Sequence, residues 1–149
     1  MGEIQNSGFE PYFHNFVAQK ISGMVHKIRG EVVRGNSIGR KLGFPTANIP
    51  VAAEMPVQDG VYAAEVRVGG ALYRAMVNIG TRPTVGDGAG RFAEANLFGF
   101  DGDIYGEPAA IFLLGYIRPE RRFASLDELR RQLADDRLAV MEYFSNAGL

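Results

Sequence analysis

The chain has 149 residues, no cysteine, a formal net charge of −1 and 46% hydrophobic residues. This composition suits one globular domain with one core, and it excludes disulfides, thiolate catalysis and cysteine-based zinc sites. No basic excess favours binding to a nucleic-acid backbone, no apolar stretch reaches the roughly 18 residues of a membrane span, and no secretory signal is visible. We therefore expect a cytoplasmic monomer with neither nucleic acid nor membrane as partner.

Most of the chain has a strand-like pattern. Residues 1–27 are expected to be an extension of unclear role, and residues 28–149 the folded domain. Glycine makes up 19 of 149 residues, well above the usual share of about 7%, which favours a turn-rich β fold. Alternation or apolar runs predict strands at residues 28–34, 61–68, 71–79, 91–100 and 109–117. The pair Gly69-Gly70 predicts a hairpin between the second and third of these strands.

A helix is predicted near the C-terminus. Ser125 and Glu128 match a capping box, in which both side chains accept hydrogen bonds from N–H groups at the start of a helix. Five or six antiparallel strands and one helix favour a small closed barrel, because closure removes exposed strand edges. Apolar residues at helical spacing are expected on one side of the helix, namely Leu126, Leu129, Leu133, Val140, Met141 and Phe144.

The most informative motif is the stretch from Gly30 to Pro50, GEVVRGNSIGRKLGFPTANIP. Gly35 and Gly39 lie in a turn whose backbone N–H groups can approach a phosphate closely. Thr46 and Asn48 are two residues apart on an extended segment, so they point to one side and offer the hard oxygen ligands that Mg²⁺ takes. The motif is not a P-loop, because its glycines lead to a Phe-Pro pair and not to a helix. The alternative is a turn stabilised by side-chain hydrogen bonds.

This stretch resembles the riboflavin kinases (flavokinases), with Gly30-x-Val32-x-x-Gly35-x-x-x-Gly39-Arg40 followed by Gly43-Phe44-Pro45-Thr46-Ala47-Asn48. Three later segments agree with the same family: NIGTRPT at 78–84, EANLFGFDGDIYG at 94–106 and RPERRFASLDEL at 118–129. Together they cover roughly residues 28–146. The resemblance implies a mainly β fold, a closed six-stranded antiparallel Greek-key barrel with a C-terminal α-helix.

The resemblance also implies a kinase that transfers the γ-phosphate of ATP to the 5′-hydroxyl of riboflavin, with Mg²⁺ or another divalent cation as cofactor. Glu94 would be the catalytic base, although an exposed strand carboxylate is the alternative for this residue. A flavin ring stacks on aromatic or guanidinium planes, which an arginine-rich loop ending in phenylalanine can supply. The remaining implied sites are the metal ligands Thr46 and Asn48, the nucleotide residues Gly35, Gly39, Arg40 and Tyr105, and the flavin residues Arg118, Arg121 and Phe123, with Arg82 a weaker flavin candidate.

The chain departs from the family pattern after Glu94. Members commonly have histidine two residues later and aspartate three residues beyond that, whereas this chain has Asn96 and Gly99. Asparagine forms hydrogen bonds but cannot titrate. A flavin- and nucleotide-binding regulatory module with little turnover is therefore one alternative, and a small β-barrel with no nucleotide role is another. FAD synthesis is not expected of this chain, because residues 1–27 cannot supply the adenylyltransferase domain that bacterial relatives often carry, unless the chain is a fragment of a longer protein.

Overall fold

The computed structural model describes residues 25–35, 43, 46–82 and 90–148. The expected extension lies outside this part of the chain, apart from its last three residues. All five predicted strands are present, with shifted ends, and the segment after Thr46 forms a further strand. The elements are β1 (His26–Glu31), β2 (Ala47–Val51), β3 (Gly60–Val68), β4 (Ala71–Arg82), β5 (Gly90–Leu97), β6 (Pro108–Arg118) and α4 (Leu126–Asn146).

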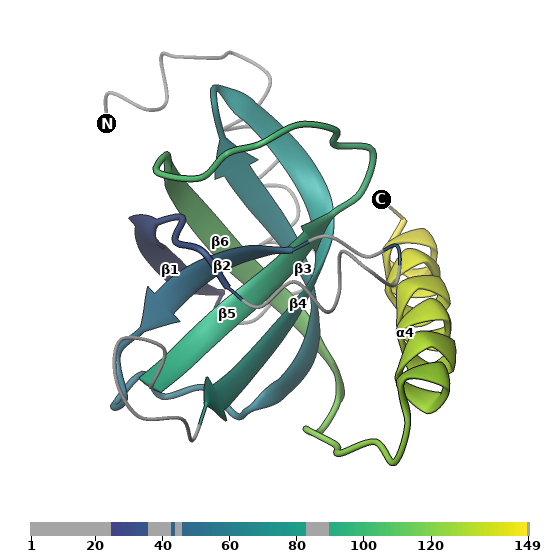
Figure 1. The fold of residues 1–149 in the computed structure, drawn as a ribbon. Helices are drawn as coiled ribbons and strands as arrows, with labels where there is room; N and C mark the ends of the chain where they lie inside the picture. The colour runs from purple at the N-terminus through teal and green to yellow at the C-terminus, as the bar shows by residue number, and fades with distance from the viewer. Residues whose placement is uncertain (1–24, 36–42, 44–45, 83–89, 149) are drawn as a thin grey trace.

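The six strands form one antiparallel sheet in the order β1-β6-β3-β4-β5-β2 (Figure 1). Strands β3, β4 and β5 are consecutive neighbours and β6 returns to lie beside β3, which is a Greek key. The sheet curls until its two edges meet. There Val33, just beyond β1, donates its N–H to the carbonyl of Asn48 at 2.8 Å. The predicted Greek-key barrel is confirmed, and within the described residues this isolated bridge takes the place of a β1–β2 ladder.

The β3–β4 hairpin forms at the predicted glycine pair. Gly69 and Gly70 have φ angles of 61° and 79°, and Val68 faces Ala71 across the turn. Two consecutive positive φ angles match the right-handed twist of the flanking strands, and glycine reaches them without a steric cost.

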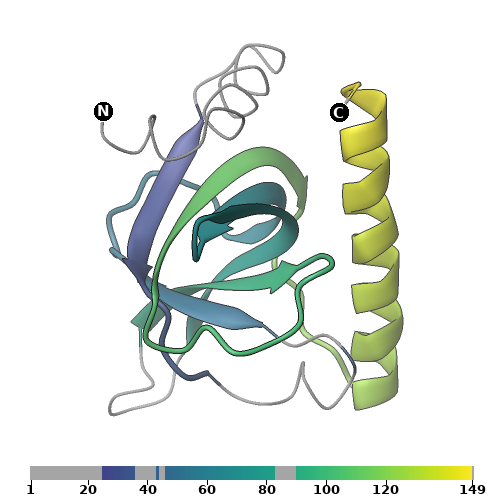
Figure 2. The ribbon, with the colours of Figure 1, turned by 90° about the horizontal axis from the view of Figure 1, so that it is seen from above.

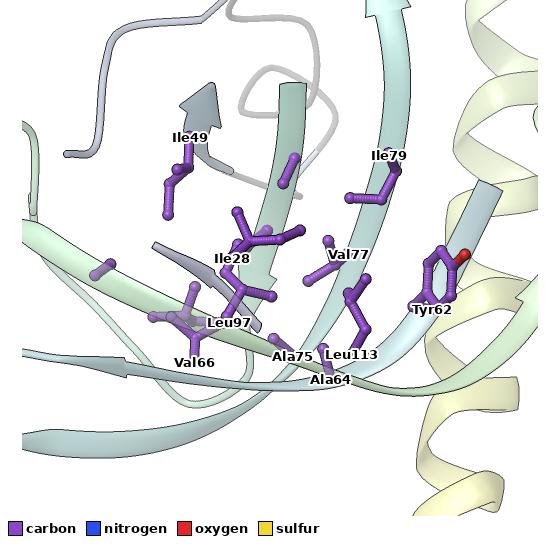
Figure 3. Packing of buried hydrophobic residues seen from close by; sticks show 14 of the residues in the cluster. Ile28, Ile49, Tyr62, Ala64, Val66, Ala75, Val77, Ile79, Leu97 and Leu113 are labelled. Carbon is purple, nitrogen blue, oxygen red and sulfur yellow. The ribbon is translucent and has the colours of Figure 1, made fainter. Parts of the chain in front are cut away.

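Small and branched apolar side chains fill the interior of the barrel, as Figure 3 shows for one part of it. A second apolar cluster lies on the outer face, where Val140 and Phe144 of α4 pack against β3, β4 and β6. The alternation predicted for β3 is confirmed, because Tyr62 and Val66 belong to the inner cluster and Val61 to the outer one.

The strand predicted over residues 91–100 extends too far at its C-terminal end. Strand β5 ends at Leu97, and Phe98 still packs against the outer cluster. Phe100 instead joins the inner cluster, with its ring centroid 5.3 Å from that of Tyr73. The chain turns between these two phenylalanines, so the period of two no longer holds.

Helix α4 begins as predicted and lies along one side of the barrel (Figure 2). The Ser125 hydroxyl accepts the N–H of Glu128 at 3.1 Å, and the Glu128 carboxylate accepts the N–H of Ala124 at 2.8 Å. The predicted apolar face was too wide, because Leu126 and Met141 are 59% and 50% exposed. A straight helix on a convex sheet brings only a narrow stripe into contact. In the described part of the chain, no helix is long and apolar enough to cross a membrane.

An ion pair joins α4 to the end of β6. The buried Asp136 accepts hydrogen bonds from Arg118 Nε and Nη2, at 2.8 and 2.7 Å, and one from Gln132 Nε2 at 2.9 Å. Because Arg118 is the last residue of β6, this bidentate pair holds the start of the following loop, residues 119–125, against α4.

Replacing Asp136 by alanine is expected to lower the free energy of unfolding by about 2–4 kcal/mol, because Arg118 would lose its partner in a partly buried place. Urea denaturation measures this loss. The neighbouring Asp135 is exposed, so Asp135→Ala is the matched control and should change stability little. Equal losses in the two variants would contradict a stabilising role for the ion pair.

Candidate functional site

Three polar side chains lie side by side on the outer face of the barrel. Glu94 on β5 is in register with Asn48 on β2 and with Asn78 on β4. Residues in register across antiparallel strands share a face of the sheet. Their chain neighbours Ile49, Ala93, Ala95, Val77 and Ile79 all point into the core. Strand pairing therefore gathers the predicted base and one predicted metal ligand into a single polar row.

Arg82, the last residue of β4, links two members of this row. Its Nη2 donates to Asn48 Oδ1 at 2.7 Å and to Glu94 Oε2 at 2.8 Å. Its guanidinium also lies 4.2 Å from the ring centroid of Phe92. Asn48 is 3% exposed and the Glu94 side chain 28%, so the amide is enclosed while the carboxylate stays accessible. The weak flavin assignment of Arg82 overlooked this position beside Glu94, although the residue lies within the NIGTRPT segment.

Gly35 gives Asn48 the space it needs. A Cβ atom at Gly35 would lie 2.2 Å from Asn48 Nδ2, which is closer than real atoms approach. The φ angle of Gly35 lies outside the left-handed region. Glycine therefore suits this position because it has no side chain, and not because of its backbone freedom.

A cavity of about 250 Å³ opens next to Asn48. Its lining includes four residues predicted at the nucleotide and metal, namely Gly35, Thr46, Asn48 and Tyr105. Tyr105 is half exposed, and the guanidinium of Arg34 lies 4.0 Å from its ring centroid. Gly39 and Arg40, the other two predicted nucleotide residues, lie outside the described residues.

The predicted flavin residues lie together around the 119–125 loop, apart from the lining of this cavity. The Arg121 guanidinium is 5.0 Å from the ring centroid of Phe123, and Arg121 also hydrogen-bonds to Gln132. Arg118 lies 5.9 Å from the same ring, but its guanidinium is paired with Asp136. Arg121 and Phe123 thus form a stacked surface, while Arg118 holds the loop in place.

Glu120 was not singled out from the sequence. Its carboxylate accepts a hydrogen bond from the Asn78 side chain, and its Oε2 would lie 2.1 Å from a Cβ at Gly80. Although the residue as a whole is exposed, burial of its carboxyl group raises the pKa of Glu120, and the bond from Asn78 opposes that rise. The 119–125 loop therefore reaches the polar row that carries Glu94. A glutamate between proline and arginine reads as a solvated loop residue, so sequence alone gave no signal.

The donors at this site suit a divalent cation that arrives with a nucleotide. Within the described ranges, no group of three histidine, cysteine, aspartate or glutamate side chains could hold a metal by itself. Thr46 and Asn48 offer a hydroxyl and an amide oxygen, and Mg²⁺ commonly takes only one or two protein ligands beside phosphates and water. Asn48 Oδ1 also accepts the hydrogen bond from the positively charged Arg82, and an amide oxygen has a second lone pair for a metal. The residues present thus fit Mg²⁺ bound jointly with phosphates.

Comparison with known proteins identifies the family to which this chain belongs. The family model described as riboflavin kinase (Flavokinase) matches residues 22–144. The chain belongs to the riboflavin kinase family. This confirms the resemblance drawn from the four sequence motifs.

Two curated riboflavin kinase relatives illustrate the relationship. The bifunctional riboflavin kinase/FMN adenylyltransferase of Escherichia coli (strain K12) is 43% identical over 129 residues, which cover 86% of this chain and 41% of that protein. The RNA-binding riboflavin kinase RibR of Bacillus subtilis (strain 168) is 41% identical over 122 residues, covering 82% of this chain and 53% of that protein. The chain therefore spans about two fifths to one half of these relatives.

A solved structure supports the fold. The crystal structure of riboflavin kinase from Trypanosoma brucei superposes with a TM-score of 0.59 at 27% sequence identity. The match covers 83% of this chain and 82% of that one. The barrel with its C-terminal helix is thus shared by this riboflavin kinase.

Gly35→Ala is expected to weaken binding of Mg·ADP about tenfold or more, because its Cβ would displace the Asn48 amide. Isothermal titration calorimetry measures the affinity. Asn48→Ala should also weaken binding, and the double variant should be no weaker than Asn48→Ala, since the obstructed amide is then gone. Losses that add in the double variant would contradict this steric coupling.

Proposed function

We propose that this chain catalyses transfer of the γ-phosphoryl group of ATP to the terminal 5′-hydroxyl of riboflavin, giving FMN and ADP. One observation carries the proposal. A single guanidinium, that of Arg82, joins the carboxylate of Glu94 to the amide of Asn48, beside a cavity that Thr46 lines. An accessible carboxylate and a pair of oxygen donors on one face are the groups that phosphoryl transfer to an alcohol requires.

Glu94 is proposed to accept the proton of the riboflavin hydroxyl. As that oxygen forms a bond to the γ-phosphorus, the bond from the γ-phosphorus to the bridging oxygen of ADP breaks, and the proton passes to the carboxylate. Arg82 holds one carboxylate oxygen at 2.8 Å and leaves the other free of this bond. The arginine therefore orients the base without capping both oxygens.

The nucleotide is proposed to bind at the cavity beside Asn48. Thr46 and Asn48 would hold Mg²⁺, which when bound supplies positive charge to the phosphates. Gly35 lets the backbone approach Asn48 closely, and we propose that Gly39 and Arg40 lie over the phosphates. Tyr105, which also lines this cavity, would contact the nucleotide.

The flavin ring is proposed to stack against the 119–125 loop. Arg121 and Phe123 already stack on one another, which provides the guanidinium and aromatic surfaces that a flat ring system prefers. For Arg118 the ion pair with Asp136 supports an indirect part, in which it fixes the position of this loop.

A second candidate function is a flavin- and nucleotide-binding module with little turnover. Asn96 favours it, because this residue stands two positions after Glu94 where family members commonly have histidine, and it is only 5% exposed.

We further propose that the chain works as a cytoplasmic monomer on these small molecules without nucleic acid. A net charge of −1 offers no general basic excess for a phosphate backbone, although one relative is named RNA-binding.

Formation of FMN is the direct test. The purified chain is expected to convert riboflavin to FMN only when ATP and Mg²⁺ are both present, as chromatographic separation of the flavins would show. Thr46→Ala should lose most of this activity, because one proposed metal ligand is removed. Riboflavin binding without any FMN would favour the binding module.

Glu94→Gln is expected to reduce turnover by about a hundredfold or more while riboflavin affinity stays unchanged, because the amide cannot accept the proton. Glu142 is exposed on α4, so Glu142→Gln removes the same charge far along the chain and serves as the control. Near-normal turnover in Glu94→Gln would remove the proposed role of the base.

A further inference from the structure

The loop that carries Arg121 and Phe123 meets the barrel through one carboxyl group. Glu120 Oε2 and Cδ would lie 2.1 and 3.0 Å from a Cβ atom at Gly80, and they are the two atoms nearest to that position. The same carboxylate accepts a hydrogen bond from the Asn78 side chain. The carboxyl group therefore occupies the place where any other residue at position 80 would put its side chain.

This contact lies on the strand face that carries the proposed base. Asn78 is in register with Glu94, and Gly80 with Phe92, the ring under the Arg82 guanidinium. The ends of the loop are held elsewhere, by Arg118 bonded to Asp136 at one end and by the Ser125 cap at the other. Glu120 thus supplies the tie between the middle of the loop and the polar row.

The surroundings of position 80 show what a side chain there would meet. Its φ lies outside the left-handed region, so an alanine there would meet no backbone strain. Among the atoms nearest to such a Cβ, only those of the Glu120 carboxyl group lie too close to it. A side chain at position 80 would therefore displace the Glu120 carboxyl group without straining the backbone.

We propose that Glu120 is a positioning residue whose carboxyl group, seated over Gly80 and bonded to Asn78, holds the 119–125 loop at a fixed place relative to Glu94. The loop then presents its Arg121–Phe123 surface to a flat aromatic substrate whose reacting hydroxyl lies at the carboxylate. The effect on flavin binding rests on the proposed function. The tie between loop and strand is independent of it.

Trypsin can test the tie directly, because Arg121 and Arg122 are exposed cleavage sites within the loop. In the full chain, Gly80→Ala and Glu120→Ala should each accelerate cleavage after these arginines about fivefold or more, as mass spectrometry of the C-terminal fragment would show. The double variant should be cleaved no faster than Glu120→Ala, because its carboxyl group is already gone. Glu120→Gln, which can still bond to Asn78, should resemble the unmodified chain, as should the exposed control Glu142→Ala.

Steady-state kinetics test the consequence for the flavin. Gly80→Ala and Glu120→Ala should each raise the KM for riboflavin about tenfold, while the KM for ATP changes less than twofold. In Glu120→Gln the KM for riboflavin should stay close to that of the unmodified chain. Unchanged cleavage in Gly80→Ala, or accelerations that multiply in the double variant, would overturn the tie. Faster cleavage with an unchanged riboflavin KM would overturn the positioning role. If the unmodified chain makes no FMN, the proposed function fails, and the cleavage rates still decide the tie.

Discussion

The site depends on the curl of one six-stranded sheet into a barrel. Small interior side chains, among them Ala64, Ala75, Ala93 and Ala95, let the strands wrap tightly around a narrow core. The curl brings the two edge strands together at the bridge between Val33 and Asn48. Because that bridge lies at the start of the glycine motif, closing the barrel also sets Gly35 over the Asn48 amide and beside the cavity.

Polar groups on the outer face are held by a small set of shared contacts. Enclosing an amide without a partner would cost roughly 2–7 kcal/mol by transfer measurements, and removing a carboxylate from water costs more, so partners stabilise both kinds of group. Arg82 meets this need for both Asn48 and Glu94 through one nitrogen, and Asn78 does so for Glu120. These shared contacts make the groups interdependent, since movement of the Arg82 guanidinium would alter the surroundings of both the proposed base and the proposed metal ligand.

The two proposed substrate regions are supported in different ways. Gly35, Thr46 and Asn48, proposed to lie at the nucleotide, are close in sequence and line one cavity. The 119–125 loop, proposed to contact the flavin, is far from them in sequence and is held by α4 through the ion pair of Arg118 and Asp136. The helix is thus more than a cover for the outer apolar cluster, because it determines where Arg121 and Phe123 can stand relative to Glu94.

Sequence alone determined the local features of this protein. Strand alternation, the Gly69-Gly70 turn and the Ser125 cap follow from interactions between residues near in the chain, and the ordered motifs were sufficient for the family. The tertiary structure alone decided which distant residues meet. Strand register decides that Arg82 meets Asn48 and Glu94, and that Glu120 lies over Gly80. The placement of the helix decides the partner of Arg118 and the exposure of Met141. Register and helix placement are set by packing over the whole barrel, and no local pattern records them.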